Sequence, residues 1–196
     1  MKKILFSFLA ATLFTAAFAQ NEYKKQPSLA VSFLLNDFKS AADIRSNGLS
    51  SVLRTKDWKN MKRMDAGIAI TYTEGLSNNV DFAGTIAGSF VNYPIKDKAP
   101  SVGNKLLLDA TAVANLKLFS DKYWVSPYLT LGVGVSQWDG YFGAFIPAGV
   151  GLQLNLWDEV FVLVNSQYRM PVTENASYHL YHSIGIAGNL FKHKKK

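Results

Sequence analysis

The sequence predicts an all-β protein, an eight-stranded antiparallel up-and-down transmembrane β-barrel. Three observations lead to this fold class. Eight segments alternate apolar with small or polar residues at the period of two that is typical of a β-strand. One face of these segments carries no charge. After an N-terminal export signal, no stretch reaches the roughly 18 consecutive apolar residues that a membrane-spanning helix needs, so a membrane-embedded chain would have to cross with strands.

The first residues have the three parts of a secretory signal peptide. Lys2 and Lys3 precede the apolar run "ILFSFLAATLFTAAF", and "AFA" stands before Gln20. We therefore predict a signal peptide over residues 1–19, an outer-membrane β-barrel domain over residues 20–191 and a basic tail over residues 192–196. The chain has no cysteine, which excludes a lipid-modified cysteine and a disulfide framework.

The period-2 segments give the predicted strands in order. They cover residues 27–38, 64–75, 80–93, 105–119, 124–138, 143–156, 159–170 and 179–191. After the first strand, the longer connections mostly fall at one end of the barrel and the tight turns at the other. Outer-membrane barrels have this arrangement, with short periplasmic turns and longer outer loops. An even number of strands returns both ends of the domain to the periplasmic side.

The two faces of the strands predict two different surroundings. One face is continuous in uncharged residues, as in Leu129, Leu131 and Val133 of the fifth strand. A lysine or arginine at mid-bilayer costs roughly 2–4 kcal/mol, so this face is suited to lipid. The opposite face is rich in small neutral residues, which suits the narrow interior of an eight-stranded barrel.

A few charged residues fall on the inner face. They are Asp109, Lys117 and Arg169, to which Asp65 and Asp81 are added. We expect an internal ion-pair network with a structural role, because an unpaired charge in a narrow interior is costly. The alternative is a gate in which exchange of partners opens a small conductance. The sequence does not assign the pairs.

Aromatic residues gather near the predicted strand ends, where the two membrane interfaces would lie. The expected interface aromatics are Trp124, Trp157, Trp138, Tyr141 and Tyr168.

The strand segments carry a family resemblance. "PSLAVSFLLNDF", "FAGTIAGSFVNYP", "PYLTLGVGVS", "GAFIPAGVGLQLNL" and "HLYHSIGIAGN" resemble the N-terminal transmembrane barrel of OmpA-like outer-membrane proteins, in the version found in Bacteroidetes-type bacteria. The resemblance covers almost the whole mature chain. It implies a protein of the outer membrane that fastens the envelope or shapes its surface. Many relatives continue into a peptidoglycan-binding domain, which cannot be carried over to this chain.

The long connection after the first strand is basic. It contains Lys39, Arg45, Arg54, Lys56, Lys59, Lys62 and Arg63. If this loop faces outward, the excess charge could contact lipopolysaccharide phosphates. The alternative is a solvated loop. Its apolar residues indicate short helical turns packed over the barrel mouth.

An enzyme is a further hypothesis, because some eight-stranded outer-membrane barrels modify lipid A with serine and histidine. In the last strand, His182 and Ser183 point to opposite faces, and His179 and Ser183 stand about 13 Å apart by strand rise. The sequence therefore predicts no catalytic residues, no metal site and no cofactor.

Three function classes follow from these observations. A structural or surface-interaction barrel without enzymatic activity is favoured; a small porin-like pore or ligand-binding barrel is the alternative, and a lipid A-modifying enzyme comes last. The expected location is the outer membrane, after export through the inner membrane. Expected partners are outer-membrane lipids and lipopolysaccharide, with the barrel-assembly machinery during biogenesis. The protein is expected to be a monomer that does not bind nucleic acid. A soluble, lipocalin-like barrel is the competing fold.

Overall fold

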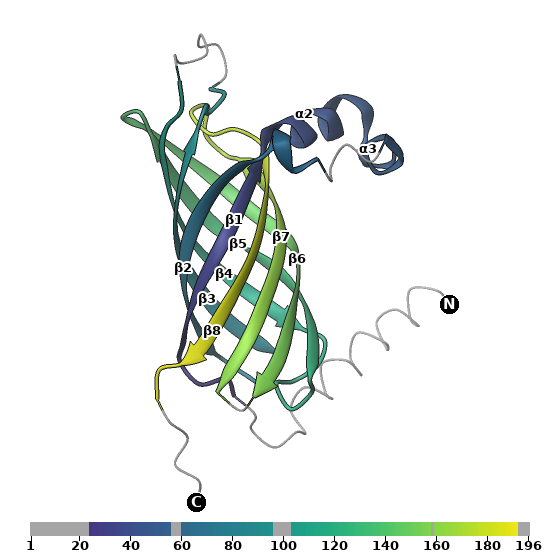
Figure 1. Cartoon of the computed structure of the whole chain (residues 1–196), viewed down its shortest axis with the longest axis vertical. Coiled ribbons are helices and arrows are strands. Elements are labelled where there is room, and N and C mark those ends of the chain that lie inside the picture. The colour runs from purple at the N-terminus through teal and green to yellow at the C-terminus, as the bar shows by residue number, and fades with distance from the viewer. Residues whose placement is uncertain (1–23, 56–59, 96–102, 158, 192–196) are drawn as a thin grey trace, which may run out of the picture.

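Eight antiparallel strands close into one barrel (Figure 1). The computed structural model describes residues 24–55, 60–95, 103–157 and 159–191, and the backbone but not the side chain of Trp157. Each strand pairs with its neighbours in the sequence, and the first pairs with the last. The strands are β1 (Ser28–Asp37), β2 (Asp65–Gly75), β3 (Val80–Val91), β4 (Lys105–Lys117), β5 (Val125–Trp138), β6 (Tyr141–Trp157), β7 (Val160–Pro171) and β8 (His179–Asn189).

The predicted fold class is confirmed, and the strand bounds agree with the predicted ones to within two residues. The predicted signal peptide and basic tail lie outside the described residues. One difference has a clear physical reason. Asp139 and Gly140 have φ values of 50° and 81°, as a two-residue hairpin turn requires. Trp138 therefore pairs directly with Tyr141, and β6 begins two residues earlier than predicted.

The two ends of the barrel differ as expected. The chain enters β1 and leaves β8 at the end we call the lower end, and the long connection between β1 and β2 lies at the upper end (Figure 1). This connection contains α2 (Phe38–Asn47), α3 (Leu49–Thr55) and the 3-10 helix η2 (Met61–Arg63). The tight turn between β5 and β6 also lies at the upper end, so not every connection at this end is long.

Helix α2 begins where β1 ends. The side chain of Asp37 accepts a hydrogen bond from the backbone N–H of Ser40 at 2.8 Å, which caps the first turn. Gly48, with φ of 80°, ends the helix and its N–H bonds the carbonyl of Ile44. Helices α2 and α3 then project sideways beyond the barrel wall, with α2 in contact with β8 (Figure 1). None of the helices in the described ranges is long and apolar enough to cross a membrane.

The outer wall carries a band of exposed apolar side chains. Ile68 and Ile86 are both 69% exposed, and Val133 is 64% exposed. Similar residues occur on every strand, among them Val31, Phe33, Ile70, Phe90, Leu129, Leu131, Val150, Ile184 and Ile186. A monomer in water rarely exposes so large a continuous apolar surface, so this band favours contact with hydrocarbon.

The inner face is narrow and mostly polar. Its buried residues include Thr73, Thr111, Thr130, Ser136 and Gln153. The interior leaves little room. A Cβ atom added to Gly151 would lie 2.1 Å from the ring of Tyr128 on the neighbouring strand, so this ring fills the space that the glycine leaves. The barrel is therefore filled by its own side chains.

Candidate functional site

The lumen contains two separate groups of charges, one near each end. The lower cluster consists of Lys25, Asp81, Lys117 and Asp121. The Nζ atom of Lys117 lies 2.9 Å from Oδ1 of Asp81 and 2.8 Å from Oδ2 of Asp121. Lys25, just before β1, brings its Nζ to 3.4 Å from Oδ2 of Asp81. The side chains of Lys25, Asp81 and Lys117 are at most 5% exposed. Two positive and two negative charges thus balance inside the lower mouth.

Amide side chains complete the lower cluster. Gln153 donates from Nε2 to Oδ1 of Asp121 at 2.8 Å, and its Oε1 accepts a hydrogen bond from Lys25. Asn155 donates to the carbonyl of Tyr123 at 2.6 Å, which fixes the lower turn to β6. The Nζ of Lys25 also lies 4.0 Å from the ring centroid of Phe161. The short segment before β1 therefore closes the lower end of the lumen with a buried lysine.

The upper cluster has one ion pair between aromatic rings. Nη1 of Arg169 lies 2.6 Å from Oδ2 of Asp109, and both side chains are almost fully buried. The guanidinium carbon lies 3.9 Å from the ring centroid of Tyr181 and 4.8 Å from that of Phe145. Nη1 also lies 3.3 Å from Nε2 of His179. Because arginine only donates, this ring nitrogen accepts.

An aromatic lid covers the upper cluster. The ring centroid of Tyr93 lies 5.3 Å from that of Phe38 and 5.9 Å from that of Trp138. Trp138 donates its indole N–H to the carbonyl of Val91 at 3.2 Å. The N–H of Ser177 donates to the hydroxyl oxygen of Tyr93 at 2.8 Å. Burial raises the pKa of the Tyr93 hydroxyl, so the lid stays uncharged in neutral solution.

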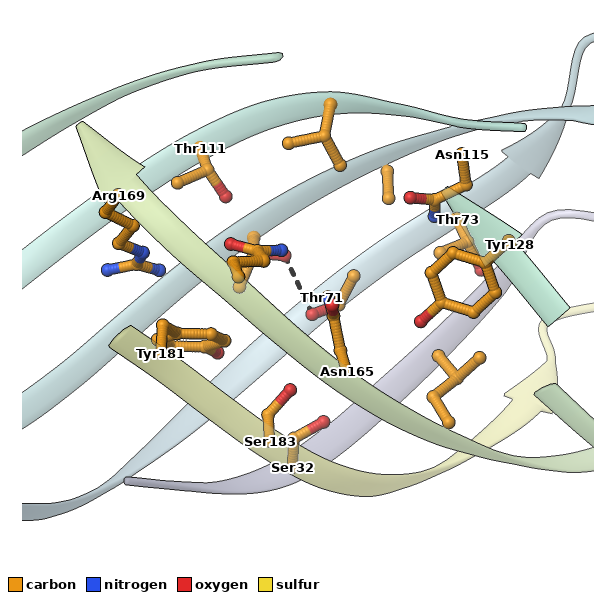
Figure 2. Close-up of a pocket in the computed structure, with 15 residues that line it drawn as sticks. Ser32, Thr71, Thr73, Thr111, Asn115, Tyr128, Asn165, Arg169, Tyr181 and Ser183 are labelled. Carbon is orange, nitrogen blue, oxygen red and sulfur yellow. Dashed lines mark hydrogen bonds between the residues drawn. The ribbon is translucent and has the colours of Figure 1, made fainter. Parts of the chain in front are cut away.

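A small polar cavity lies between the two ends. It has a volume of about 40 Å³ and is lined largely by hydroxyl and amide groups, as Figure 2 shows. The side-chain oxygens of Asn115, Asn165 and Gln167 have no hydrogen-bond partner among the described residues. At about 10–15 Å³ for each water molecule, the cavity has room for about three. The lumen is thus a short polar chamber between two closed ends.

Four of the five predicted lumenal residues are buried inside the barrel, but they form two clusters and not one network. Asp109 pairs with Arg169 and Asp81 pairs with Lys117. Asp65 belongs to neither cluster, because it starts β2 at the upper rim, where it lines a pocket with Lys39, Lys62 and Arg63. Lys25, which lies outside every predicted strand, also takes part in the lower cluster.

The expected interface aromatics differ in how far they are exposed. Trp124 is 65% exposed and Tyr141 is 38% exposed, each beside a strand end. Tyr168 is half-buried and packs on Tyr178 with ring centroids 5.8 Å apart. The prediction was wrong for Trp138, which is 6% exposed, because it shares the inward face of β5 with Ser136. The side chain of Trp157 lies outside the described residues.

The basic residues of the long connection lie at the upper end of the barrel. Lys39 and Arg45 are on α2, and Arg54 is on α3, all exposed. Two more are on η2: Lys62, and Arg63, whose Nη2 lies 2.8 Å from Oδ2 of Asp43. The other two, Lys56 and Lys59, fall outside the described residues. The apolar residues of this loop that the structure describes lie on helices, as expected. Phe38, the first residue of α2, contributes to the aromatic lid over the upper mouth, whereas the rest of α2 and α3 project sideways (Figure 1). Trp58 of this loop lies outside the described residues.

The histidines of β8 point apart, as the strand period predicts. His179 is fully buried in the lumen, and Ser183 lines the cavity. His182 faces outward, where its Nδ1 lies 2.9 Å from Oγ of Ser166 on β7. The sequence does not predict this contact, because it depends on the register between β7 and β8 and not on the positions along β8. In the described part of the chain, no three His, Asp or Glu side chains are grouped as metal ligands.

Comparisons with known proteins identify the fold. No model of a known protein family and no curated protein matches the chain. Among solved structures, it is similar to Neisserial surface protein A, with 16% identity, a TM-score of 0.54, and coverage of 85% of this chain and 99% of that one. It is also similar to the N-terminal β-barrel domain of Pseudomonas aeruginosa OprF, with 10% identity, a TM-score of 0.50, and coverage of 83% and 97%. The chain therefore has the fold of eight-stranded outer-membrane barrels.

Proposed function

We propose that this protein is an integral β-barrel of the outer membrane with a structural or surface-interaction role and without enzymatic activity. The distribution of charge between its two faces carries the proposal. Buried aspartates, lysines and an arginine pair with one another inside the lumen, whereas the outer wall exposes apolar side chains on every strand. An exposed apolar outer wall is stable in the hydrocarbon core of a bilayer, whereas in water it would be unfavourable.

The mobility of the unheated protein on a gel tests the proposal. The mature chain is refolded into detergent micelles or phospholipid vesicles, and heated and unheated samples are compared. We expect a band that shifts on heating, and no folded protein without detergent or lipid. A monodisperse, fully folded chain in plain buffer with no affinity for bilayers would overturn the proposal and favour a lipocalin-like barrel.

The proposed partners follow from this location. The basic side chains on α2, α3 and η2 lie at the end opposite to the chain termini of the barrel domain (Figure 1). With those termini on the periplasmic side, the helices would face the outer leaflet and its lipopolysaccharide phosphates. Export through the inner membrane and insertion by the barrel-assembly machinery would precede this state. We expect a monomer, because a barrel has no free strand edge.

A small pore is the second candidate function. The polar cavity between the two clusters favours it, because a pore would need a polar path through the lumen and this cavity supplies a short part of one. Planar-bilayer recordings separate the two functions. A structural barrel gives no channel events, whereas a pore gives discrete ones. A lipid A mass profile that is unchanged by the protein is expected for a barrel without enzymatic activity.

A further inference from the structure

The outward face of β7 and β8 interrupts the apolar band with a polar pair. Ser166 and His182 are direct partners across the two strands, and both are half-buried. The next outward pair toward the lower end is Val164 and Ile184, which are 39% and 55% exposed. Two residues along a strand correspond to about 7 Å. The polar pair therefore lies directly next to the apolar part of the outer wall, on the side that faces the upper end of the barrel.

Polar groups in this position need partners. The bond between Oγ of Ser166 and Nδ1 of His182 satisfies only one ring nitrogen of the histidine. Lipid chains offer neither a donor nor an acceptor, so an outward polar pair is unfavourable against acyl chains alone. A lipid headgroup linkage, with its hydroxyl, amide and phosphate oxygens, offers both.

Helix α2 places a cation above the same pair. The guanidinium carbon of Arg45 lies 4.2 Å from the ring centroid of Tyr178. Tyr178 in turn packs on Tyr168, which is the next outward residue on β7 above Ser166. The two rings therefore hold the exposed Arg45 beside the outer wall, where the helices overhang it (Figure 1). A guanidinium held on a ring loses less rotamer freedom when it binds a further group.

We propose that this outward face of β7 and β8, beneath α2, is a binding site for one phosphorylated lipid of the outer leaflet. Its phosphate contacts Arg45, its linkage groups hydrogen-bond Ser166 and His182, and an acyl chain follows Val164 and Ile184. The planar guanidinium matches phosphate oxygens in a two-point contact. This site deepens the proposed function and rests on it, since it requires the barrel to be in a bilayer.

The position of the site favours a lipid over a second copy of the chain. The lower part of the site is continuous with the apolar band that surrounds the barrel, so its occupant needs an apolar portion. The upper part presents a cation from a helix that extends over the wall, so the same occupant needs an anionic head. A phosphorylated lipid combines the two in this order along the membrane normal.

Native mass spectrometry tests the site. The full mature chain, refolded in detergent micelles, is titrated with phosphorylated lipid A and with lipid A whose phosphates have been removed. We expect Arg45→Gln to weaken binding of phosphorylated lipid A about ten-fold, the loss of one partly exposed charge-assisted contact. Arg54→Gln, which removes an exposed charge from α3, is the matched control and should change binding less than about two-fold.

Two further arms distinguish the phosphate from the rest of the lipid. Dephosphorylated lipid A should bind the unchanged protein about as weakly as phosphorylated lipid A binds the Arg45→Gln variant. The double variant Ser166→Val with His182→Leu keeps the wall apolar and should weaken binding of both lipids several-fold. Equal losses in the Arg45 and Arg54 variants would overturn the site, since they would indicate diffuse attraction.

Three outcomes distinguish a failure of the proposed lipid site from a failure of the proposed function. A heat-modifiable, membrane-inserted barrel that does not distinguish the two lipids overturns the site and leaves the proposed function intact. A chain that does not insert overturns the proposed function itself. A dimer in the native spectra that disappears in the Ser166 and His182 double variant overturns the site by showing that a second copy covers it.

Discussion

The two ends of the lumen bury charge in different ways. At the lower end, two lysines and two aspartates share their charges, and Asp81 contacts both ammonium groups. At the upper end, Arg169 has a single carboxylate partner, Asp109, and lies between two aromatic rings. An ammonium group has three donors around a point charge, whereas a guanidinium is planar and stacks on rings.

This difference predicts unequal tolerance to substitution. Removal of Lys25 or Asp121 leaves each remaining charge of the lower cluster in an ion pair, and removal of Lys117 still leaves Asp81 paired with Lys25. Removal of Asp109 leaves the buried guanidinium of Arg169 without its carboxylate partner. The upper end should therefore be the more sensitive of the two, and the following variants test this order from the largest effect to the smallest.

Asp109→Ala should have the largest effect. Loss of one partner from a buried ion pair costs about 3–5 kcal/mol in the free energy of unfolding. Urea unfolding of the barrel in vesicles, followed by the gel mobility of unheated samples, measures it. Asp109→Ala combined with Arg169→Met removes both charges and should recover most of the loss. A double variant as unstable as the single one would contradict the role of the unpaired charge.

Lys117→Met should cost less, about 2 kcal/mol in the free energy of unfolding. Asp81 keeps Lys25 as a partner, and the side chain of Asp121 is 18% exposed, so water can solvate part of it. The same urea series measures the effect. If this variant is less stable than Asp109→Ala, the remaining pair of Lys25 and Asp81 does not compensate for the loss, and the upper end is not the more sensitive of the two.

Lys25→Ala should lower the free energy of unfolding by about 1 kcal/mol, because Asp81 then keeps Lys117. Lys122→Ala, an exposed lysine in the turn between β4 and β5, is the control and should stay within about 0.5 kcal/mol of the unchanged protein. The measurement is again urea unfolding. Equal effects of the two variants would show that the buried lysine adds nothing to the lower end.

Lys105→Ala should have the smallest effect. Its Nζ lies 2.5 Å from Oδ2 of Asp139, but the two side chains are 43% and 39% exposed. Exposed pairs contribute about 0.2–1 kcal/mol, and less in high salt. Urea unfolding at low and at high salt measures both the size of this contribution and its decrease with salt. A loss as large as that of Lys117→Met would mean that exposure does not explain the order.

The sequence predicted most of the fold because one rule governs all eight strands. A period of two places alternate residues on opposite faces, so Asp81, Asp109, Lys117 and Arg169 could be assigned to the lumen from their positions alone. The same rule places Trp138 inside, two residues after Ser136. That residue was assigned to the interface because aromatic residues near strand ends suggested a girdle, and the alternation was the stronger constraint.

The alternation of residues along a strand does not predict which residues contact one another across strands. The pairing of Ser166 with His182 requires the register between β7 and β8, which depends on the length and shape of their connection. Lys25 lies outside any strand, and its place in the lower mouth depends on how the chain enters β1. Sequence periodicity therefore predicts which face a residue occupies, and the closed barrel decides what it contacts.

The seam between β1 and β8 also has a kinetic consequence. Nine residues of β1 pair with β2 along one edge of the strand. The other edge of β1 pairs with β8, the last strand of the domain. Every intermediate that lacks β8 exposes two rows of backbone donors and acceptors, each costing several kcal/mol in hydrocarbon. Contacts between such distant parts of a chain form slowly. Insertion should therefore proceed as one late, concerted step, with a half-time that lengthens sharply when β8 is weakened.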